Sequence, residues 1–273
     1  MTAKLGKIGI WRPHTDLTTE LAVEVENLGY GTVWVGGSPP ADLGAVERLL
    51  DATERITVAT GIVNIWNSDA KTVAESYHRV TEKHPGRLLL GIGAGHREAT
   101  AEYAKPYTAL VNYLDVLDAE GVPKSDRVLA ALGPRVLELA RDRAAGAHPY
   151  LTVPAHTEQA RSTLGDGPLL APEQKVVLDA DPQRARTTAR PMIRFYLRLT
   201  NYTRNLQRYG YTEDDVAGTG SDRLVDDLAV HGTAEEIAAR LTAHIEAGAD
   251  HVAIQPLGED PLPAYKALAN ALG

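Results

Sequence analysis

The chain has 273 residues, a net charge of −8 and no cysteine. The negative charge argues against nucleic-acid binding, which needs a basic face, and the lack of cysteine excludes disulfides, thiolate catalysis and cysteine-based metal centres. The first residues lack the apolar core of a signal peptide and no apolar run approaches the roughly 18 residues of a membrane span, so we expect a cytoplasmic protein without a membrane partner.

Short apolar runs recur along the chain and are typical of strands buried on both faces, as in a parallel sheet. They cover residues 7–11, 32–36, 56–62, 88–94, 127–132, 147–151, 175–179 and 251–257. Eight such strands, each followed by a helix, predict an α/β fold of the (β/α)8 TIM-barrel type. A doubly wound open sheet is the structural alternative.

Helical patterns lie between these runs. Residues 18–31, 42–55, 133–146 and 232–250 carry apolar side chains at helical spacing. The last of these begins with Thr233 and Glu236 in capping-box spacing and ends at Gly248. We therefore expect helices in these four ranges.

The segment between the seventh and eighth strands is too long for one helix. We expect residues 180–230 to form a helical insertion, with two helices and a loop, within a single domain that spans residues 1–273. An insertion of this kind on a barrel usually shapes substrate access or a subunit contact.

The segment "GIGAGH" at 91–96 ends the fourth strand in three alternating glycines and His96. It lacks the third glycine of a dinucleotide fingerprint and does not follow the first strand, so we reject that interpretation. Two explanations of the glycines stay open: a flat ring or a phosphate lies against the backbone, or the glycines relieve crowding inside a narrow barrel. His96 is a candidate acid–base group at the barrel mouth, although a lone histidine is more often structural.

The segment "ALGPR" at 131–135 places a helix start at the same end of the barrel. The free N–H groups and the positive dipole end of such a helix can bind an anion, and Arg135 can add charge; a plain helix start is the alternative. His148 and His156 have weaker claims to function, and Trp11, Trp34 and Trp66 are expected to pack in the core. Histidines and carboxylates lack metal-ligand spacing, and no Gly-x-Ser-x-Gly motif is present, so we expect neither a metal site nor a serine hydrolase.

Several of these segments together resemble the luciferase-like monooxygenase superfamily, in particular its branch that uses the deazaflavin coenzyme F420. The resemblance covers essentially the whole chain and is carried by "LGYGTVWVG", "ERITVATGIVNIW", "PGRLLLGIGAGH", "RVLAALGPRVLELARDRAAGAHPYL", "LLAPEQKVVL" and "HGTAEEIAARLTAHIEAGADHV". It implies a non-proline cis peptide at Gly61–Ile62 behind the cofactor ring, a ring contact at 93–96 and a phosphate seat at 131–135. The cofactor-binding residues it implies are Gly36, Gly37, Gly61, Ile62, Val63, Gly93, Ala94, Gly95, Ala131, Leu132, Gly133, Pro134 and Arg135.

The chain departs from the sugar-phosphate dehydrogenases of this family. They carry Asp-His after the second strand and Glu after the fourth, whereas this chain has Gly37 and Ser38 at the first place and His96 at the second. We therefore do not expect sugar-phosphate oxidation. The resemblance implies instead an F420-dependent oxidoreductase that reduces a small unsaturated or carbonyl compound, with His96 as proton donor and with Ser38 and Asn64 as polar groups that orient the substrate.

Two other functions stay open. One is an FMN-dependent monooxygenase on the same barrel, and the other is a cofactor-binding protein without turnover. The family resemblance also implies a homodimer.

Overall fold

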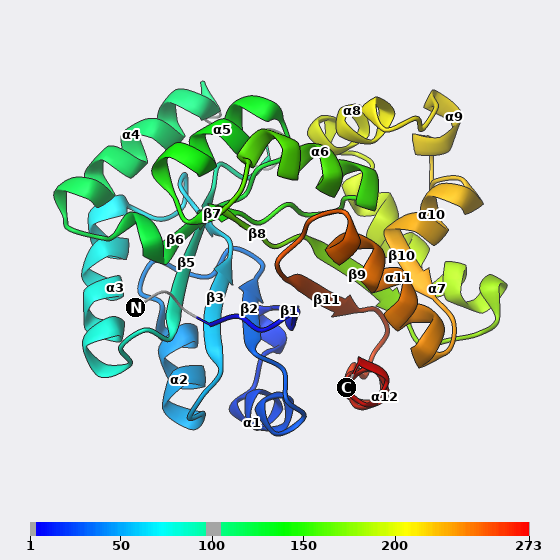
Figure 1. Ribbon diagram of the computed structural model, residues 1–273, viewed down its shortest axis with the longest axis horizontal. Coiled ribbons are helices and arrows are strands. Elements are labelled where there is room, and N and C mark those ends of the chain that lie inside the picture. The colour runs from blue at the N-terminus through cyan, green and yellow to red at the C-terminus, as the bar shows by residue number, and fades with distance from the viewer. Residues whose placement is uncertain (1–3, 97–104, 273) are drawn as a thin grey trace.

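The computed structural model describes residues 4–96 and 105–272, and parallel strands curl around its centre (Figure 1). The strands are β1 (Ile8–Pro13), β2 (Thr32–Gly36), β3 (Thr57–Gly61), β4 (Val63–Asn64), β5 (Leu88–Gly93), β6 (Arg127–Leu129), β7 (Gly146–Ala147), β8 (Leu169–Leu170), β9 (Glu173–Val177), β10 (Ala229–His231) and β11 (Val252–Pro256).

The sheet closes into a barrel. From β1 the pairing runs through β2, β3, β5, β6 and β7 to β8 in one direction and through β11 to β9 in the other. Only Ala171 and Pro172 separate β8 from β9, so the segment 169–177 joins the two ends of the sheet. This arrangement confirms the predicted eight-stranded barrel. The extra strand β10 pairs with β9 outside the ring.

Several predicted strands differ from the structure. The predicted strand 127–132 ends at Leu129, and the predicted strand 147–151 contributes only Ala147 to β7, because the chain leaves the sheet there and Leu151 adopts a left-handed φ of 55°. The seventh strand begins earlier than predicted, at Glu173, and the three-residue strand β10 was not predicted.

Helices surround the barrel: α1 (Thr19–Asn27), α2 (Gly44–Ala52), α3 (Ala70–Lys83), α4 (Pro106–Ala119), α5 (Pro134–Arg143), α6 (Pro154–Leu164), α7 (Pro182–Tyr196), α8 (Thr200–Arg208), α9 (Glu213–Val216), α10 (Asp222–Leu228), α11 (Ala234–Glu246) and α12 (Leu262–Leu272). The four predicted helices are confirmed as α1, α2, α5 and α11, and the capping box of Thr233 and Glu236 is formed. None of the helices in the described ranges is long and apolar enough to cross a membrane.

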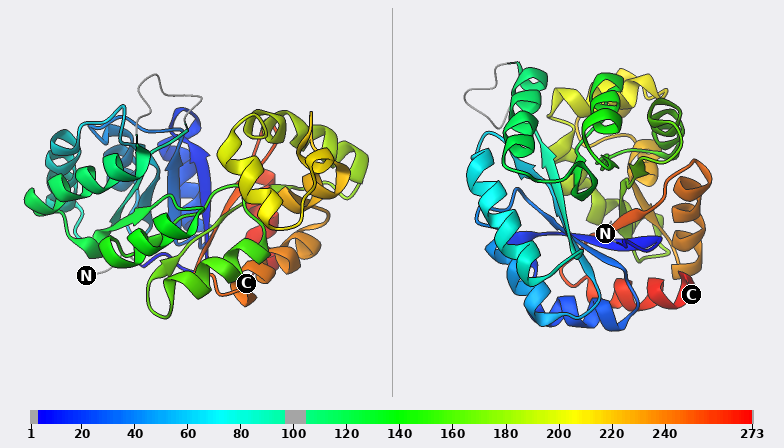
Figure 2. Two further views of the ribbon diagram at one scale, coloured as in Figure 1. Left: turned by 90° about the horizontal axis from the view of Figure 1, so that it is seen from above. Right: turned by 60° about the vertical axis from the view of Figure 1, so that its left-hand side comes forward.

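The segment between β9 and β10 holds four helices, α7–α10, where two and a loop were expected. Gly210, Gly218 and Gly220 have left-handed φ values and divide the chain into these short pieces. The four helices gather on one side of the molecule, opposite α2 and α3 (Figures 1 and 2). They pack on a second apolar cluster of their own, which includes Ile193 and Leu206.

Side chains fill the barrel interior in layers. Leu5 and Leu89 lie near the amino-terminal ends of the strands, Trp34 lies in the middle, and Trp11 lies toward the carboxyl-terminal ends. Trp34 is fully buried and stacks on His148 with ring centroids 3.9 Å apart, as expected for a core tryptophan. The interior is therefore a packed core, and we expect space for a ligand beyond the carboxyl-terminal ends of the strands.

Candidate functional site

The predicted site segments meet at the carboxyl-terminal ends of the strands, which we call the mouth of the barrel. Gly36 at the end of β2 pairs with Gly61 at the end of β3, and Asn64 of β4 pairs with Gly93 of β5. The chain after β5 continues to His96 on the same side. The structure thus brings together residues that lie far apart in the sequence.

The link between β3 and β4 has the predicted geometry. The Gly61–Ile62 peptide bond is cis, and Val63 and Asn64 then pair with β5. The Trp11 indole donates a hydrogen bond of 3.1 Å to the Gly61 carbonyl, which fixes this segment from the interior of the barrel.

Protein atoms explain most of the mouth glycines. A Cβ on Gly36 would lie 2.1 Å from the Trp11 ring, and a Cβ on Gly91 would lie 1.9 Å from the Thr60 carbonyl oxygen. A Cβ on Gly93 would meet Ala130 at 2.8 Å, and one on Gly95 would meet Asn64 at 2.6 Å. Crowding, the second of the two explanations that the sequence left open, therefore accounts for these positions without a ligand.

The three predicted catalytic side chains have different surroundings. Asn64 is buried, and its Oδ1 accepts a hydrogen bond from the Trp66 amide at 3.0 Å, so it fixes the 64–67 turn. Ser38 is exposed in the turn after β2, next to Gly37, and both have left-handed φ values. His96 is partly exposed, and its ring lies 5.1 Å from the ring of Tyr202.

The predicted anion seat lies at the start of α5. Gly133 is the N-cap, Pro134 opens the helix, and the exposed Arg135 guanidinium lies 4.4 Å from the Tyr107 ring centre. His156, in the first turn of α6, has its Nε2 3.0 Å from the Leu132 carbonyl oxygen. Ala131 just before them is buried. Pro134 has no N–H group, and the Val136 and Leu137 amides donate to the Gly133 carbonyl oxygen at 3.1 Å. Within the described residues, the Gly133 and Arg135 amides are therefore the ones at this helix start that an anion could use.

Arg208 was missed by the sequence analysis. The atom nearest to a Cβ on Gly133 would be Arg208 Nη1, at 3.8 Å, so the last residue of α8 adds a guanidinium to the α5 start. Arg208 is exposed and makes no hydrogen bond or ion pair with the described residues, whereas Arg184, Arg186 and Arg190 of the same insertion all pair with aspartates. An arginine cluster in a predicted insertion was the only available signal.

A buried ion pair at the mouth was also missed. Lys175 and Glu173 alternate along β9, so both face the interior, while Gln174 between them contacts His244 of α11. Lys175 Nζ lies 3.0 Å from both Glu173 carboxylate oxygens, and the two side chains are 0% and 1% exposed. Two charges at alternate positions of a predicted buried strand were a signal for this pair.

Tyrosines cover the ion pair. The ring centre of Tyr150 lies 3.9 Å and that of Tyr196 lies 5.2 Å from Lys175 Nζ, and Tyr202 packs against both tyrosines. The Tyr150 hydroxyl donates a hydrogen bond of 2.9 Å to Gln255 Oε1 of β11. Tyr196 and Tyr202 come from α7 and α8, so the insertion forms one wall of the mouth.

Burial sets the electrostatics of this cluster. It raises the pKa of Glu173 and lowers the pKa of Lys175, while the attraction between them works against both shifts. Burial also raises the pKa of Tyr196 to about 12 and the pKa of Tyr150 well above its ordinary value, so both hydroxyls stay protonated at neutral pH.

Comparison with known proteins identifies the family. The family model described as luciferase-like monooxygenase matches residues 12–251. The chain belongs to the luciferase-like monooxygenase family.

Solved structures of other proteins share this luciferase-like fold. An F420-dependent secondary alcohol dehydrogenase has a TM-score of 0.77 at 15% identity, covering 99% of this chain and 100% of that chain. The F420-dependent tetrahydromethanopterin reductase from Methanopyrus kandleri has a TM-score of 0.79 at 16% identity, covering 98% and 99%. The FMN-bound oxygenating constituent of 3,6-diketocamphane monooxygenase from Pseudomonas putida has a TM-score of 0.70 at 13% identity, covering 97% and 96%.

One curated relative matches part of the chain. The N-acetyl-S-alkylcysteine monooxygenase of Bacillus subtilis is 32% identical over 138 residues, which is 43% of this chain and 40% of that protein. Structures that share this fold therefore include F420-dependent enzymes and an FMN-bound monooxygenase.

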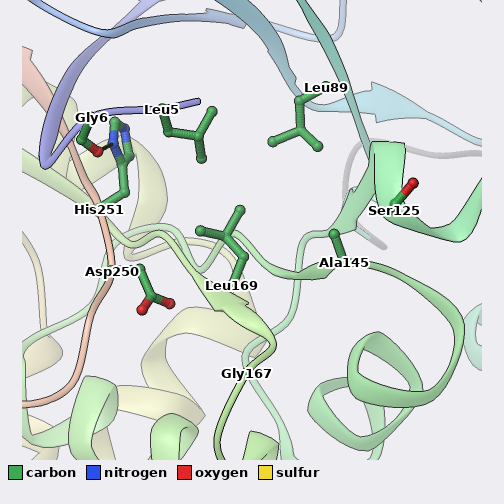
Figure 3. A pocket seen from close by; sticks show the side chains of 9 residues that line it. All are labelled: Leu5, Gly6, Leu89, Ser125, Ala145, Gly167, Leu169, Asp250 and His251. Atoms are coloured by element: carbon green, nitrogen blue, oxygen red, sulfur yellow. Dashed lines mark hydrogen bonds between the residues drawn. The ribbon is translucent and has the colours of Figure 1, made fainter. Parts of the chain in front are cut away.

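The opposite end of this luciferase-like barrel holds a cavity of about 310 Å³ (Figure 3). Leu5, Leu89 and Leu169 point toward one another across it, and His251 lies at its edge. These residues stand at the amino-terminal ends of strands, where TIM-barrel enzymes do not carry their chemistry. Across residues 4–96 and 105–272, no group of three histidine or carboxylate side chains is arranged to bind a metal.

Proposed function

We propose that the protein is an F420-dependent oxidoreductase that transfers a hydride between deazaflavin C5 and a small organic substrate. The observation that carries the proposal is the Arg208 guanidinium beside Gly133 at the start of α5, which has no hydrogen-bond or ion-pair partner among residues 4–96 and 105–272. Amide N–H groups at a helix start and such a guanidinium would form a cradle for a phosphate, which is the anchor of a phosphorylated cofactor.

The residues at the mouth fit such a cofactor. Arg208, Gly133 and Arg135 would hold its phosphate, and the segment 61–64 would lie behind its ring. When bound, the deazaflavin supplies a hydride acceptor or donor, which the side chains of the mouth do not contain. The residues of the chain would bind and orient the substrate, and the tyrosines would shield the Glu173–Lys175 pair from solvent.

Two features favour the deazaflavin over FMN. The F420-dependent neighbours have TM-scores of 0.77 and 0.79 and are covered almost completely, compared with 0.70 for the FMN-bound neighbour. The family segments quoted from the sequence point to the same branch. Reduction of a carbonyl or unsaturated compound is the reaction that we infer.

The test is a titration of the purified protein with oxidised F420, followed by the fluorescence of the cofactor. We expect a dissociation constant below about 50 µM, which corresponds to roughly −6 kcal/mol. Arg208→Gln should weaken binding about tenfold, because it removes a charge-assisted contact to the phosphate. Arg184→Gln is the matched control, since Arg184 is already paired with Asp179 and Asp181. A wild-type protein that leaves the fluorescence unchanged would overturn the proposal.

An FMN-dependent monooxygenase is the second candidate, and the Bacillus subtilis relative favours it. The phosphate cradle would serve FMN equally well. A parallel titration with FMN separates the two: preferential binding of FMN, together with oxygen consumption in the presence of a flavin reductase, would replace the deazaflavin by FMN.

A further inference from the structure

The Glu173–Lys175 pair is an unusual occupant of a barrel interior. Its members are almost completely buried, and a neutral pair of similar volume would hold the strands together equally well or better. Glu173 has one further contact, in which it accepts a hydrogen bond of 3.2 Å from the Leu151 amide. The pair is therefore tied to the segment that carries Tyr150.

The ammonium group of Lys175 fixes the Tyr150 ring. With the ring centre 3.9 Å from Nζ, the buried cation lies against the π-face of the tyrosine. Trp11 packs against the same ring, with centroids 5.2 Å apart. The orientation of Tyr150 is thus determined by one charge and one indole.

The hydroxyl of Tyr150 lies where the predicted site residues converge. On one side, Trp11 packs against the Tyr150 ring and donates a hydrogen bond to the Gly61 carbonyl. On the other side, the ring centre of Tyr202 lies 6.2 Å from that of Tyr150, and Tyr202 also contacts His96. Its hydrogen-bond partner Gln255 is buried, whereas Tyr150 itself is partly exposed. The mouth therefore gives access to part of Tyr150, whereas Lys175 and Glu173 are covered. A substrate oxygen that binds the Tyr150 hydroxyl would take the place of Gln255 Oε1 as its acceptor.

We propose that Tyr150 is the catalytic residue that binds the substrate oxygen and donates a proton to it, and that Lys175, held by Glu173, is the positioning residue for Tyr150. The proposal rests on the proposed function for the source of the hydride. It names the substrate class as a carbonyl compound in the reducing direction and an alcohol in the oxidising direction.

Bound reduced deazaflavin would supply a hydride, with its two electrons, to the carbonyl carbon, and the π pair of the C=O bond would move onto the oxygen. That oxygen takes the proton of Tyr150 Oη, whose O–H bond breaks. The phenolate, stabilised by the ammonium against its ring, regains a proton from water at its exposed edge. Oxidation of the alcohol runs through the same atoms in reverse.

The first measurement needs no turnover. The protein is loaded with oxidised F420 and titrated with acetone, cyclohexanone, cyclohex-2-enone and benzaldehyde, while the fluorescence of the bound cofactor is followed. We expect at least one probe to bind the wild type and to bind Tyr150→Phe about tenfold more weakly, because one hydrogen bond to the probe oxygen is lost. Tyr30→Phe is the control, because its hydroxyl donates to the Tyr265 carbonyl away from the mouth. Equal affinity in Tyr150→Phe, or no response of the wild type to any probe, overturns the proposal.

The second measurement is oxidation of reduced F420 by the same probes. In Tyr150→Phe we expect kcat to fall about 100-fold or more while the dissociation constant of F420 stays within about twofold. The double variant Glu173→Gln/Lys175→Met leaves no unpaired charge, so it should fold. Its kcat should fall about tenfold and its solvent deuterium isotope effect should rise, because proton transfer becomes slower. A purely structural pair would leave the isotope effect unchanged, and that result overturns the role of Lys175.

The two proposals fail in different ways. A wild-type protein that does not bind F420 overturns the proposed function and this inference together. A wild-type protein that binds F420 and reduces a probe, alongside a Tyr150→Phe variant that matches it, overturns only the role of Tyr150.

Discussion

At the amino-terminal end of the barrel the buried His251 is tied to fixed partners, whereas at the mouth a buried ion pair packs against side chains that are partly exposed. His251 Nδ1 lies 2.8 Å from the Gly6 carbonyl oxygen, and the Trp34 indole donates to His251 Nε2 at 3.0 Å. Lys175 instead pairs with Glu173 and lies against Tyr150, which is partly exposed. The first arrangement closes the fold, and the second positions groups around the mouth.

The cavity at the amino-terminal end of the barrel strengthens this contrast. Leu5, Leu89 and Leu169 surround that space, and its nearest histidine has both ring nitrogens engaged (Figure 3). At the mouth, the Arg208 guanidinium has no hydrogen-bond or ion-pair partner in the part of the chain that the structure describes. The hydrogen-bonding state of the polar groups is therefore a better basis for the proposed cofactor site than the presence of a cavity.

The largest effect is expected from breaking the ion pair at the mouth. Lys175→Met leaves the Glu173 carboxylate buried and unpaired, which should lower the free energy of unfolding by about 3–5 kcal/mol. Urea denaturation of Lys175→Met and of Glu173→Gln/Lys175→Met measures this directly, and the double variant should recover most of the loss. A single variant as stable as the wild type would mean that the pair carries no charge in the folded protein.

These mouth residues also mark the limit of what the sequence could predict. Periodicity identified the barrel because eight apolar runs and their helices follow simple spacing, and the resemblance located Gly61–Ile62 and the start of α5. Lys175 and Arg208 were missed because their importance depends on what lies beside them. Tyr150 comes from the segment after β7, Tyr196 and Tyr202 come from the insertion, and no local pattern places them around one ammonium group.

Protonation of His251 should test the fixed end of the comparison. Burial lowers the pKa of His251 from 6.5 to about 4, and a proton on Nε2 would face the Trp34 N–H group. Between these values the unfolded chain binds the proton and the folded protein does not, so stability is fully present above pH 6.5 and is lost as the pH falls toward 4.

The measurement compares the wild type with His251→Gln in urea denaturation at several pH values. In the variant, unfolding should take up about one proton fewer than in the wild type. The slopes of the unfolding free energy against pH should then differ by up to roughly 1.4 kcal/mol per pH unit as the pH falls below 6.5. Burial also lowers the pKa values of His148 and His244 to about 4. The contribution of His244 cancels between the two proteins, whereas that of His148 changes somewhat, because His251 also lowers the pKa of His148. Parallel curves would contradict a neutral, hydrogen-bonded His251.

The smallest effect on stability is expected from filling the cavity at the amino-terminal end of the barrel. Ala145 lines this cavity together with Leu89 and Leu169. The substitution Ala145→Val adds two carbon atoms to the side chain that faces it. Since each buried methylene contributes about 0.8 kcal/mol and the side chain gains two carbons, stability should rise by no more than roughly 1.6 kcal/mol. The affinity for F420 should stay within about twofold, because the cavity and the Gly133–Arg208 cradle lie at opposite ends of the strands. A clear loss of F420 binding in a variant that remains as stable as the wild type would show that the two ends are coupled, and the division between a fold-holding end and a ligand-facing end would then be wrong.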